Sequence, residues 1–98
     1  MIKSERMIEM NQETTIGISL HVDHEIIDLQ IPRQVTIARL KERLIELLSK
    51  YQLLLPKFFD LVVLNKSIQL NEDLSLFDYP ISEGDQLFVK PYLFNGDN

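Results

Sequence analysis

The residues best suited to metal chemistry cluster between positions 21 and 25. His21 and Asp23 are two apart, so both side chains lie on one face of an extended strand, and His24 follows in a predicted turn. Two imidazoles and a carboxylate can bind zinc or copper, but a metal site also needs ligands held in a fixed arrangement by supporting hydrogen bonds. Because the sequence indicates no such support, we interpret the cluster as a solvated hairpin tip and expect no metal or other cofactor.

Catalytic groups of other kinds have no recognisable setting. The chain has no cysteine, which excludes a disulfide framework, a thiolate zinc site and a cysteine nucleophile. Its serines lack the Gly-x-Ser-x-Gly setting of a hydrolase nucleophile, and neither a P-loop nor a dinucleotide-binding fingerprint is present. The carboxylates fall on predicted turns, where such groups more often cap or solubilise than act as acid and base. We therefore expect that the protein is not an enzyme.

The charge of the chain restricts its partners. Its 98 residues include 15 acidic and 10 basic side chains, a formal net charge of −5. Nucleic acids and anionic lipid surfaces both attract clusters of Lys and Arg, so we expect protein partners rather than nucleic acid or membrane. No apolar run approaches the roughly 20 residues of a membrane span. Charged residues also interrupt the N-terminus where a signal peptide would be apolar, and we expect a cytoplasmic protein.

Two periodicities divide the chain into elements. Apolar residues alternate over 16–22 and over 27–31, which predicts two antiparallel strands joined by a turn. A helical spacing then predicts a helix over about 36–50, with the Thr36 hydroxyl capping its first turn. Further along, we expect strands at 61–64, 68–70 and 87–90, a short irregular or 3₁₀ segment near 76–79, and a turn at 82–85 that uses the positive φ open to Gly84.

These elements predict an α+β fold in the order β-β-α-β-β-β, with one helix packed on a mixed sheet in a β-grasp arrangement. We expect the domain to span residues 15–91, with a flexible N-terminal extension over 1–14 and a C-terminal tail over 92–98. The predicted core consists of Ile16, Ile18, Leu20, Ile27, Leu29, Ile31, Ile37, Leu40, Leu44, Leu61, Val63, Leu70, Leu76, Ile81, Leu87 and Val89.

The second half of the chain resembles ubiquitin. The similar features are the spacing from Leu70 to Leu76, the Asp78-Tyr79-x-Ile81 turn and the closing Leu87-x-Val89 strand. Upstream, Val35-Thr36-Ile37-x-x-Leu40-Lys41 resembles the start of ubiquitin's helix. The resemblance covers roughly residues 16–90 and implies a ubiquitin-like β-grasp domain, a fold that serves many functions.

Two motifs narrow the resemblance to one family. They are Asp28-Leu29-x-Ile31-Pro32, five residues before Ile37, and Asp78-Tyr79-x-Ile81-x-x-Gly84-Asp85-x-Leu87. Both are similar to the YukD/EsaB-like proteins, small cytoplasmic ubiquitin-like components of the type VII (WXG100) secretion systems of Gram-positive bacteria. This resemblance implies an accessory or regulatory role in the secretion machinery, through protein–protein docking and without conjugation.

Two other functions stay open at this point. A ubiquitin-like modifier or sulfur carrier needs a C-terminal Gly-Gly, whereas this sequence ends in Asn95-Gly96-Asp97-Asn98, which argues against that class. A stand-alone β-grasp scaffold in another pathway would have the same sequence pattern, because a fold does not determine a function. The sequence also leaves a homodimer open.

Alternation along the last strands predicts which side chains face away from the helix. They are Val62, Leu64, Phe88 and Lys90. The last three fall where ubiquitin carries its hydrophobic partner-binding patch, as the resemblance aligns them. An exposed apolar strip is typical of an interaction site. The alternative is that the strip is covered by Tyr92, Leu93 and Phe94 of the tail, or by the N-terminal extension.

A second candidate surface lies on the predicted helix. Its cations are Arg39, Lys41 and Arg43, with Arg33 and Lys50 nearby. Such a group could bind an acidic partner. Because glutamates are interleaved with these cations, the alternative is an ordinary solvated helix face.

Overall fold

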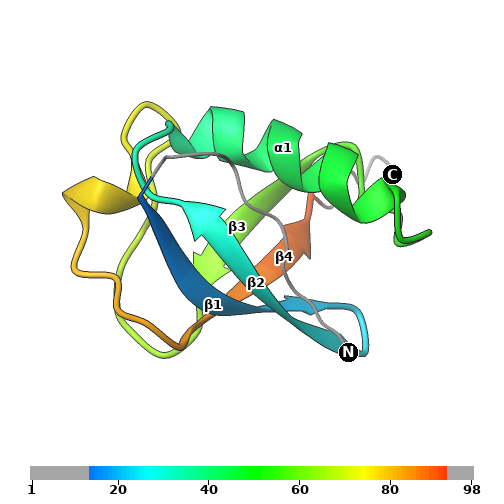
Figure 1. Cartoon of the computed structure of the whole chain (residues 1–98), viewed down its shortest axis with the longest axis horizontal. Coiled ribbons are helices and arrows are strands. Elements are labelled where there is room, and N and C mark those ends of the chain that lie inside the picture. The colour runs from blue at the N-terminus through cyan, green and yellow to red at the C-terminus, as the bar shows by residue number, and fades with distance from the viewer. Residues whose placement is uncertain (1–13, 93–98) are drawn as a thin grey trace.

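The computed structural model describes residues 14–92. Apart from Thr14 and Tyr92, the predicted N-terminal extension and C-terminal tail lie outside this range. The described chain forms one α-helix packed across one face of a four-stranded sheet (Figure 1). In chain order the elements are β1 Thr15–Val22, β2 Glu25–Pro32, α1 Ile37–Ser49, β3 Phe59–Val63, the 3₁₀ helix η1 Leu76–Asp78 and β4 Asp85–Pro91.

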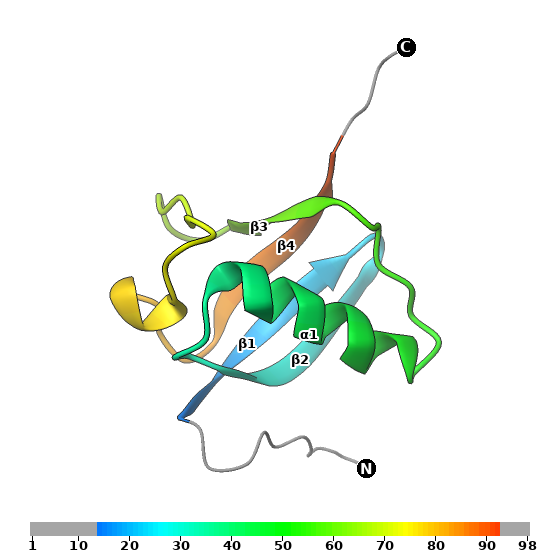
Figure 2. The same cartoon turned by 90° about the horizontal axis from the view of Figure 1, so that it is seen from above.

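The first and last strands meet in the middle of the sheet. The strand order is β2-β1-β4-β3, with β1 parallel to β4 and both outer pairs antiparallel. In this register Leu20 of β1 lies opposite Ile27 of β2 and Leu87 of β4. Figure 2 shows α1 lying across one face of the sheet. The α+β class and the β-grasp arrangement predicted from the sequence are confirmed.

Side chains from every element fill the space between sheet and helix. Three predicted core residues, Ile27, Leu29 and Leu70, are only half-buried at its margin, because β2 is an edge strand and residues 68–70 lie beside the sheet. Val22, Leu48 and Phe59 are buried although the sequence pattern does not select them. The buried apolar residues are Ile16, Ile18, Leu20, Val22, Ile31, Ile37, Leu40, Leu44, Leu48, Phe59, Leu61, Val63, Leu76, Ile81, Leu87 and Val89.

The strand predicted over residues 68–70 is wrong. These residues belong to no strand and pair with none. Ile68 and Leu70 pack against the margin of the core, while the N–H of Asn71 donates to the Tyr79 hydroxyl at 2.7 Å. Side-chain packing and a side-chain acceptor therefore hold this segment in place of a strand ladder, and the outer edge of β3 is left open.

Helix α1 begins where the sequence predicts. The Thr36 backbone is extended, and its Oγ1 accepts a hydrogen bond from the Arg39 N–H at 3.1 Å, which is the geometry of an N-cap. Leu40, Leu44 and Leu48 recur every fourth residue and are buried against the sheet. No helix within residues 14–92 is long and apolar enough to cross a membrane.

Replacing Thr36 tests the cap. We expect Thr36→Ala to lower the free energy of unfolding by about 1 kcal/mol, because one amide of the first turn loses its acceptor. Thr36→Ser keeps the hydroxyl and should stay close to the wild type. Urea denaturation measures both variants, and a loss in the serine variant as large as in the alanine variant would contradict the capping role.

Asp85 is the only buried polar or charged side chain within residues 14–92, at 4% exposed. Its carboxylate lies 2.7 Å from Lys66 Nζ and accepts hydrogen bonds from Asn65 Nδ2 at 2.9 Å and from the Ser82 N–H at 2.8 Å. Burial by itself raises the pKa of Asp85, but these hydrogen bonds and the charge of Lys66 together hold it below its ordinary value. Asp85 thus joins the start of β4 to the loop that contains Asn65 and Lys66 and to the turn that begins at Ser82.

The lowered pKa has a consequence for acid stability. A carboxylate whose pKa is lower in the folded state contributes its full stabilisation above the unfolded-state pKa, here 3.8, and loses it as the pH falls through the folded-state pKa. We expect Asp85→Asn to cost about 2 kcal/mol at neutral pH, because charge-assisted hydrogen bonds are lost. The variant should also lose less further stability on acidification than the wild type.

Urea denaturation at a series of pH values from neutral to strongly acidic measures this difference. The matched control is Asp73→Asn, because Asp73 is exposed and its replacement should change little. Identical acid sensitivity of Asp85→Asn and the wild type would show that Asp85 does not act in this way.

Candidate protein-interaction surface

The sheet face opposite α1 carries a row of side chains that crosses all four strands. Ile26 on β2 lies opposite His21 on β1. On its other side His21 lies opposite Phe88 on β4, which in turn lies opposite Val62 on β3. Directly opposed residues share one face of a sheet, and Leu87, the neighbour of Phe88, is buried on the other face. We call these four outward residues the outer row.

Leu64 and Lys90 flank the outer row on the same face. The Leu64 N–H donates to the Gln86 C=O at 2.8 Å, which continues the register one residue beyond β3, and the Leu64 side chain is 50% exposed. Lys90 is exposed and lies opposite Asp60. The structure thus brings together on two adjacent strands the residues selected from the sequence, Val62, Leu64, Phe88 and Lys90.

Ile26 extends this surface, although the alternation along β3 and β4 does not select it. Its side chain is 63% exposed, the most exposed of the outer row. A signal is present in the sequence, because Ile27, Leu29 and Ile31 follow the inward period of their strand and leave Ile26 on the outward face. An apolar residue at an outward strand position, such as Ile26, indicates an exposed apolar contact.

The tail residue that the structure describes does not lie over the outer row. Tyr92 stacks on Phe58, with ring centroids 6.4 Å apart and planes inclined by 18°. Its hydroxyl donates to the Asp60 carboxylate at 3.3 Å. Tyr92 therefore contacts the beginning of β3, whereas Val62 lies toward the other end of that strand. The remaining residues proposed as a cover, Leu93, Phe94 and the N-terminal extension, lie outside the described residues.

The histidine cluster has a different arrangement from a ligand set. His21 Nε2 lies 2.5 Å from Gln86 Oε1, so the ring is hydrogen-bonded to β4. Asp23 turns the chain between β1 and β2 with a positive φ of 53°. Within residues 14–92, no three His, Cys, Asp or Glu side chains are grouped so that they could hold a metal ion. His21 acts as a cross-strand contact.

The three helix cations do not share one face. Arg39 and Arg43 are four residues apart and lie on the same side of α1, with Arg39 exposed and Arg43 half-buried. Lys41 lies elsewhere, and its side chain is only 12% exposed. Lys41 forms an ion pair with Glu72, lies 3.7 Å from Asp60 and is 5.6 Å from the centre of the Phe59 ring.

Comparison with known proteins gives one family match. The model of the family described as WXG100 protein secretion system (Wss), protein YukD, matches residues 15–89. A search of curated protein sequences finds no match.

Several solved structures are similar in fold. The ubiquitin-like domain of the Mycobacterium tuberculosis type VII secretion system protein EccD1 superposes with a TM-score of 0.61 at 18% identity, covering 79% of this chain and 98% of that one. Caldiarchaeum subterraneum ubiquitin gives 0.60 at 14% identity, covering 85% and 100%. The ubiquitin-like domain of Plasmodium falciparum Dsk2 gives 0.57 at 18% identity, covering 78% and 96%.

These similarities establish a ubiquitin-like β-grasp fold, as the sequence resemblance implies. The family match is more specific than the structural similarities. It spans β1, β2, α1, β3 and most of β4, and it includes both motifs that resemble YukD/EsaB-like proteins. The chain belongs to the YukD family of WXG100 (type VII) secretion system proteins.

Proposed function

We propose that this protein is a non-enzymatic, non-conjugated accessory or regulatory component of a type VII secretion system. It acts in the cytoplasm by docking on another protein of the machinery. The outer row and its flanking residues Leu64 and Lys90 form the docking surface, with no covalent chemistry involved. Family membership supports the assignment to the secretion system.

The observation that carries the docking proposal is a group of apolar side chains on the outer face of the sheet. Phe88 and Val62 are adjacent on β4 and β3, and Leu64 is exposed beside them. Ile26 is exposed on β2, beyond His21, and α1 covers only the opposite face. Exposed apolar groups that lie together favour burial against a partner, at about 25 cal/mol for each Å² removed from water. The cation Lys90 at the margin adds a preference for a partner with a nearby acidic group.

Affinity copurification from the native cells, with and without crosslinker, tests this proposal. We expect the tagged wild type to recover membrane-anchored secretion ATPase or WXG100-type proteins, identified by mass spectrometry. The double variant Leu64→Asp with Phe88→Asp should lose this recovery about tenfold or more, because two charges would have to be buried in the contact. Its circular dichroism spectrum should match that of the wild type, and its thermal unfolding should remain cooperative.

The control places the same two changes elsewhere on the surface. Leu74 and Phe77 are 42% and 59% exposed. Leu74 lies just before η1 and Phe77 lies within it, away from the outer row. Leu74→Asp with Phe77→Asp should therefore retain recovery. Full recovery by a folded Leu64→Asp, Phe88→Asp protein would refute the docking surface. Covalent ladders of heavier species would instead indicate a modifier, and recovery of unrelated proteins alone would indicate a scaffold of another pathway.

The helix cations form a second, smaller contact in the proposal. Arg39 and Arg43 share one side of α1 and could contact acidic groups of a partner, while Lys41 lies on another side and pairs with Glu72. In the same copurification, Arg39→Glu with Arg43→Glu tests this contact, and unchanged recovery would remove it from the docking surface. Sedimentation of the purified protein tests whether the outer face binds a second copy.

A further inference from the structure

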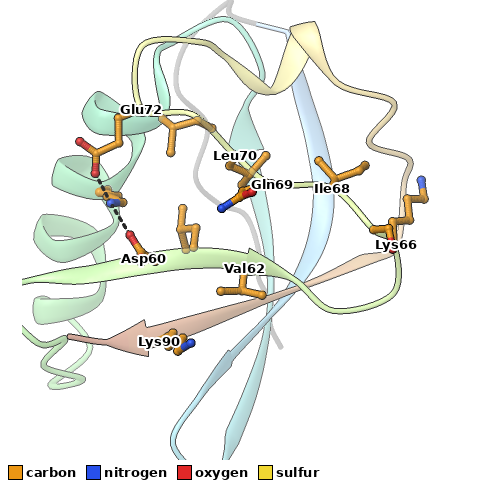
Figure 3. Close-up of a pocket in the computed structure, with 12 residues that line it drawn as sticks. Asp60, Val62, Lys66, Ile68, Gln69, Leu70, Glu72 and Lys90 are labelled. Carbon is orange, nitrogen blue, oxygen red and sulfur yellow. Dashed lines mark hydrogen bonds and ion pairs between the residues drawn. The ribbon is translucent and has the colours of Figure 1, made fainter. Parts of the chain in front are cut away.

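A groove runs along the outer edge of β3. It encloses a volume of about 510 Å³ between β3, the segment over residues 66–72 and the first turns of α1 (Figure 3). Ile37 contributes from the helix, Val62 from β3, and Ile68 and Leu70 from the segment. Figure 3 shows the segment facing β3 across this space, with the Gln69 side chain pointing toward the strand. The groove exists because residues 68–70 do not pair with β3.

Backbone groups of β3 point into this groove. The hydrogen bonds Leu64 N–H to Gln86 C=O, at 2.8 Å, and Tyr92 N–H to Phe58 C=O, at 3.2 Å, bracket the β3–β4 ladder. In an antiparallel ladder, successive residues direct their N–H and C=O groups alternately to the two sides. Residues with even numbers therefore bond to β4, and the odd-numbered Leu61 and Val63 direct theirs to the open edge.

We propose that the groove binds one extended peptide segment of a partner protein, which pairs with the edge of β3 and places acidic side chains beside Lys90. Unpaired strand edges bind extended chains through main-chain hydrogen bonds. Because residues 66–72 close the far side of the groove, it admits a single chain and excludes the edge of another folded sheet.

The groove is lined by three cations, Lys41, Lys66 and Lys90, and by two carboxylates, Asp60 and Glu72, and the preference for acidic residues comes from Lys90. Lys41 is paired with Glu72 and Asp60, and Lys66 with Asp85. Lys90 also lines the groove and is exposed, and no ion pair joins it to another residue within the described range 14–92. A carboxylate of the bound peptide would give Lys90 an ion-pair partner.

Alternation of side chains defines the rest of the peptide. In an added strand, every second side chain points to the helix side and the others to the outer face. On the helix side they meet Ile37 and Leu70, so apolar residues fit. On the outer face the nearest side chains are Asp60 and Val62 of β3, and Lys90 lies opposite Asp60 on β4. Because the Asp60 carboxylate lies 3.7 Å from Lys41 Nζ, Lys90 is left to pair with an acidic residue of the peptide. The preferred segment therefore alternates apolar and acidic residues. The groove shares Val62 and Lys90 with the proposed docking surface but requires neither Leu64 nor Phe88, so variants at those two positions distinguish the two sites.

Two short end-capped peptides test the proposal against the full chain, one alternating Asp and Val and the other alternating Lys and Val. In a ¹⁵N NMR titration we expect the Asp peptide to bind about tenfold or more tightly than the Lys peptide. Its binding should slow hydrogen exchange of the Leu61 and Val63 amides, while the Val62 amide, already paired with β4, changes little. Lys90→Glu should reverse the preference between the peptides.

Changes at Gln69 separate the groove from the outer row. Gln69 is exposed, so Gln69→Trp should fill the groove without disturbing the core and should weaken binding of the Asp peptide about tenfold, whereas Gln69→Ala leaves the groove open. Leu64→Asp with Phe88→Asp should bind the peptide normally. Absence of binding, equal binding of both peptides, unchanged exchange at Leu61 and Val63, or normal binding by Gln69→Trp would each overturn the proposal.

Discussion

The parallel pairing of β1 with β4 is the contact on which the other elements depend. It joins the strands that are farthest apart in the sequence, so its loop-closure cost is large and other contacts must fix its register. Asp85 begins β4 opposite Ile18 of β1. Nearby, the Gly84 N–H donates to the Gly17 C=O at 2.8 Å, and the Gly17 N–H donates to the Glu83 carboxylate at 3.1 Å.

With this central pair in place, the positions of the remaining elements follow. β2 joins β1 through a tight turn, β3 joins β4 on the other side, and α1 covers the face that both pairs make apolar. The same arrangement leaves the second face without a cover from the described chain. Val62 and Lys90 belong both to this outer face and to the groove beside β3, so a partner bound at one would contact residues of the other.

Local patterns in the sequence were sufficient for most elements. Alternation identifies β1 and β2, short apolar segments identify β3 and β4, and the leucine spacing identifies α1. Thr36 marks the start of α1, because an N-cap is a local interaction. The outward direction of the Val62 and Phe88 side chains follows from the alternation of side chains along a strand. Gly84 adopts the predicted positive φ, at 88°.

Features that depend on distant partners could not be predicted. Residues 68–70 have an apolar alternation typical of a strand, but a strand also requires a neighbour with free backbone groups at hydrogen-bonding distance. The pairing of Lys41 with Glu72 and the burial of Asp85 depend on loops whose course no local pattern defines. The separation of Lys41 from Arg39, in contrast, follows from local spacing, because residues two apart on a helix do not share a face.

The parallel central pair also determines how the domain would respond to a pulling force. β1 begins at Thr15 and β4 ends at Pro91, and in parallel neighbours these two points lie at opposite ends of the shared ladder. Tension applied through the two ends of the domain would therefore shear the ladder and load its hydrogen bonds together. β3 and β4 are antiparallel neighbours. Tension that pulls them apart at one end of their ladder would instead open its hydrogen bonds one after another. We therefore expect the domain to resist tension between residues 15 and 91 more strongly than tension applied at one end of the β3–β4 pair.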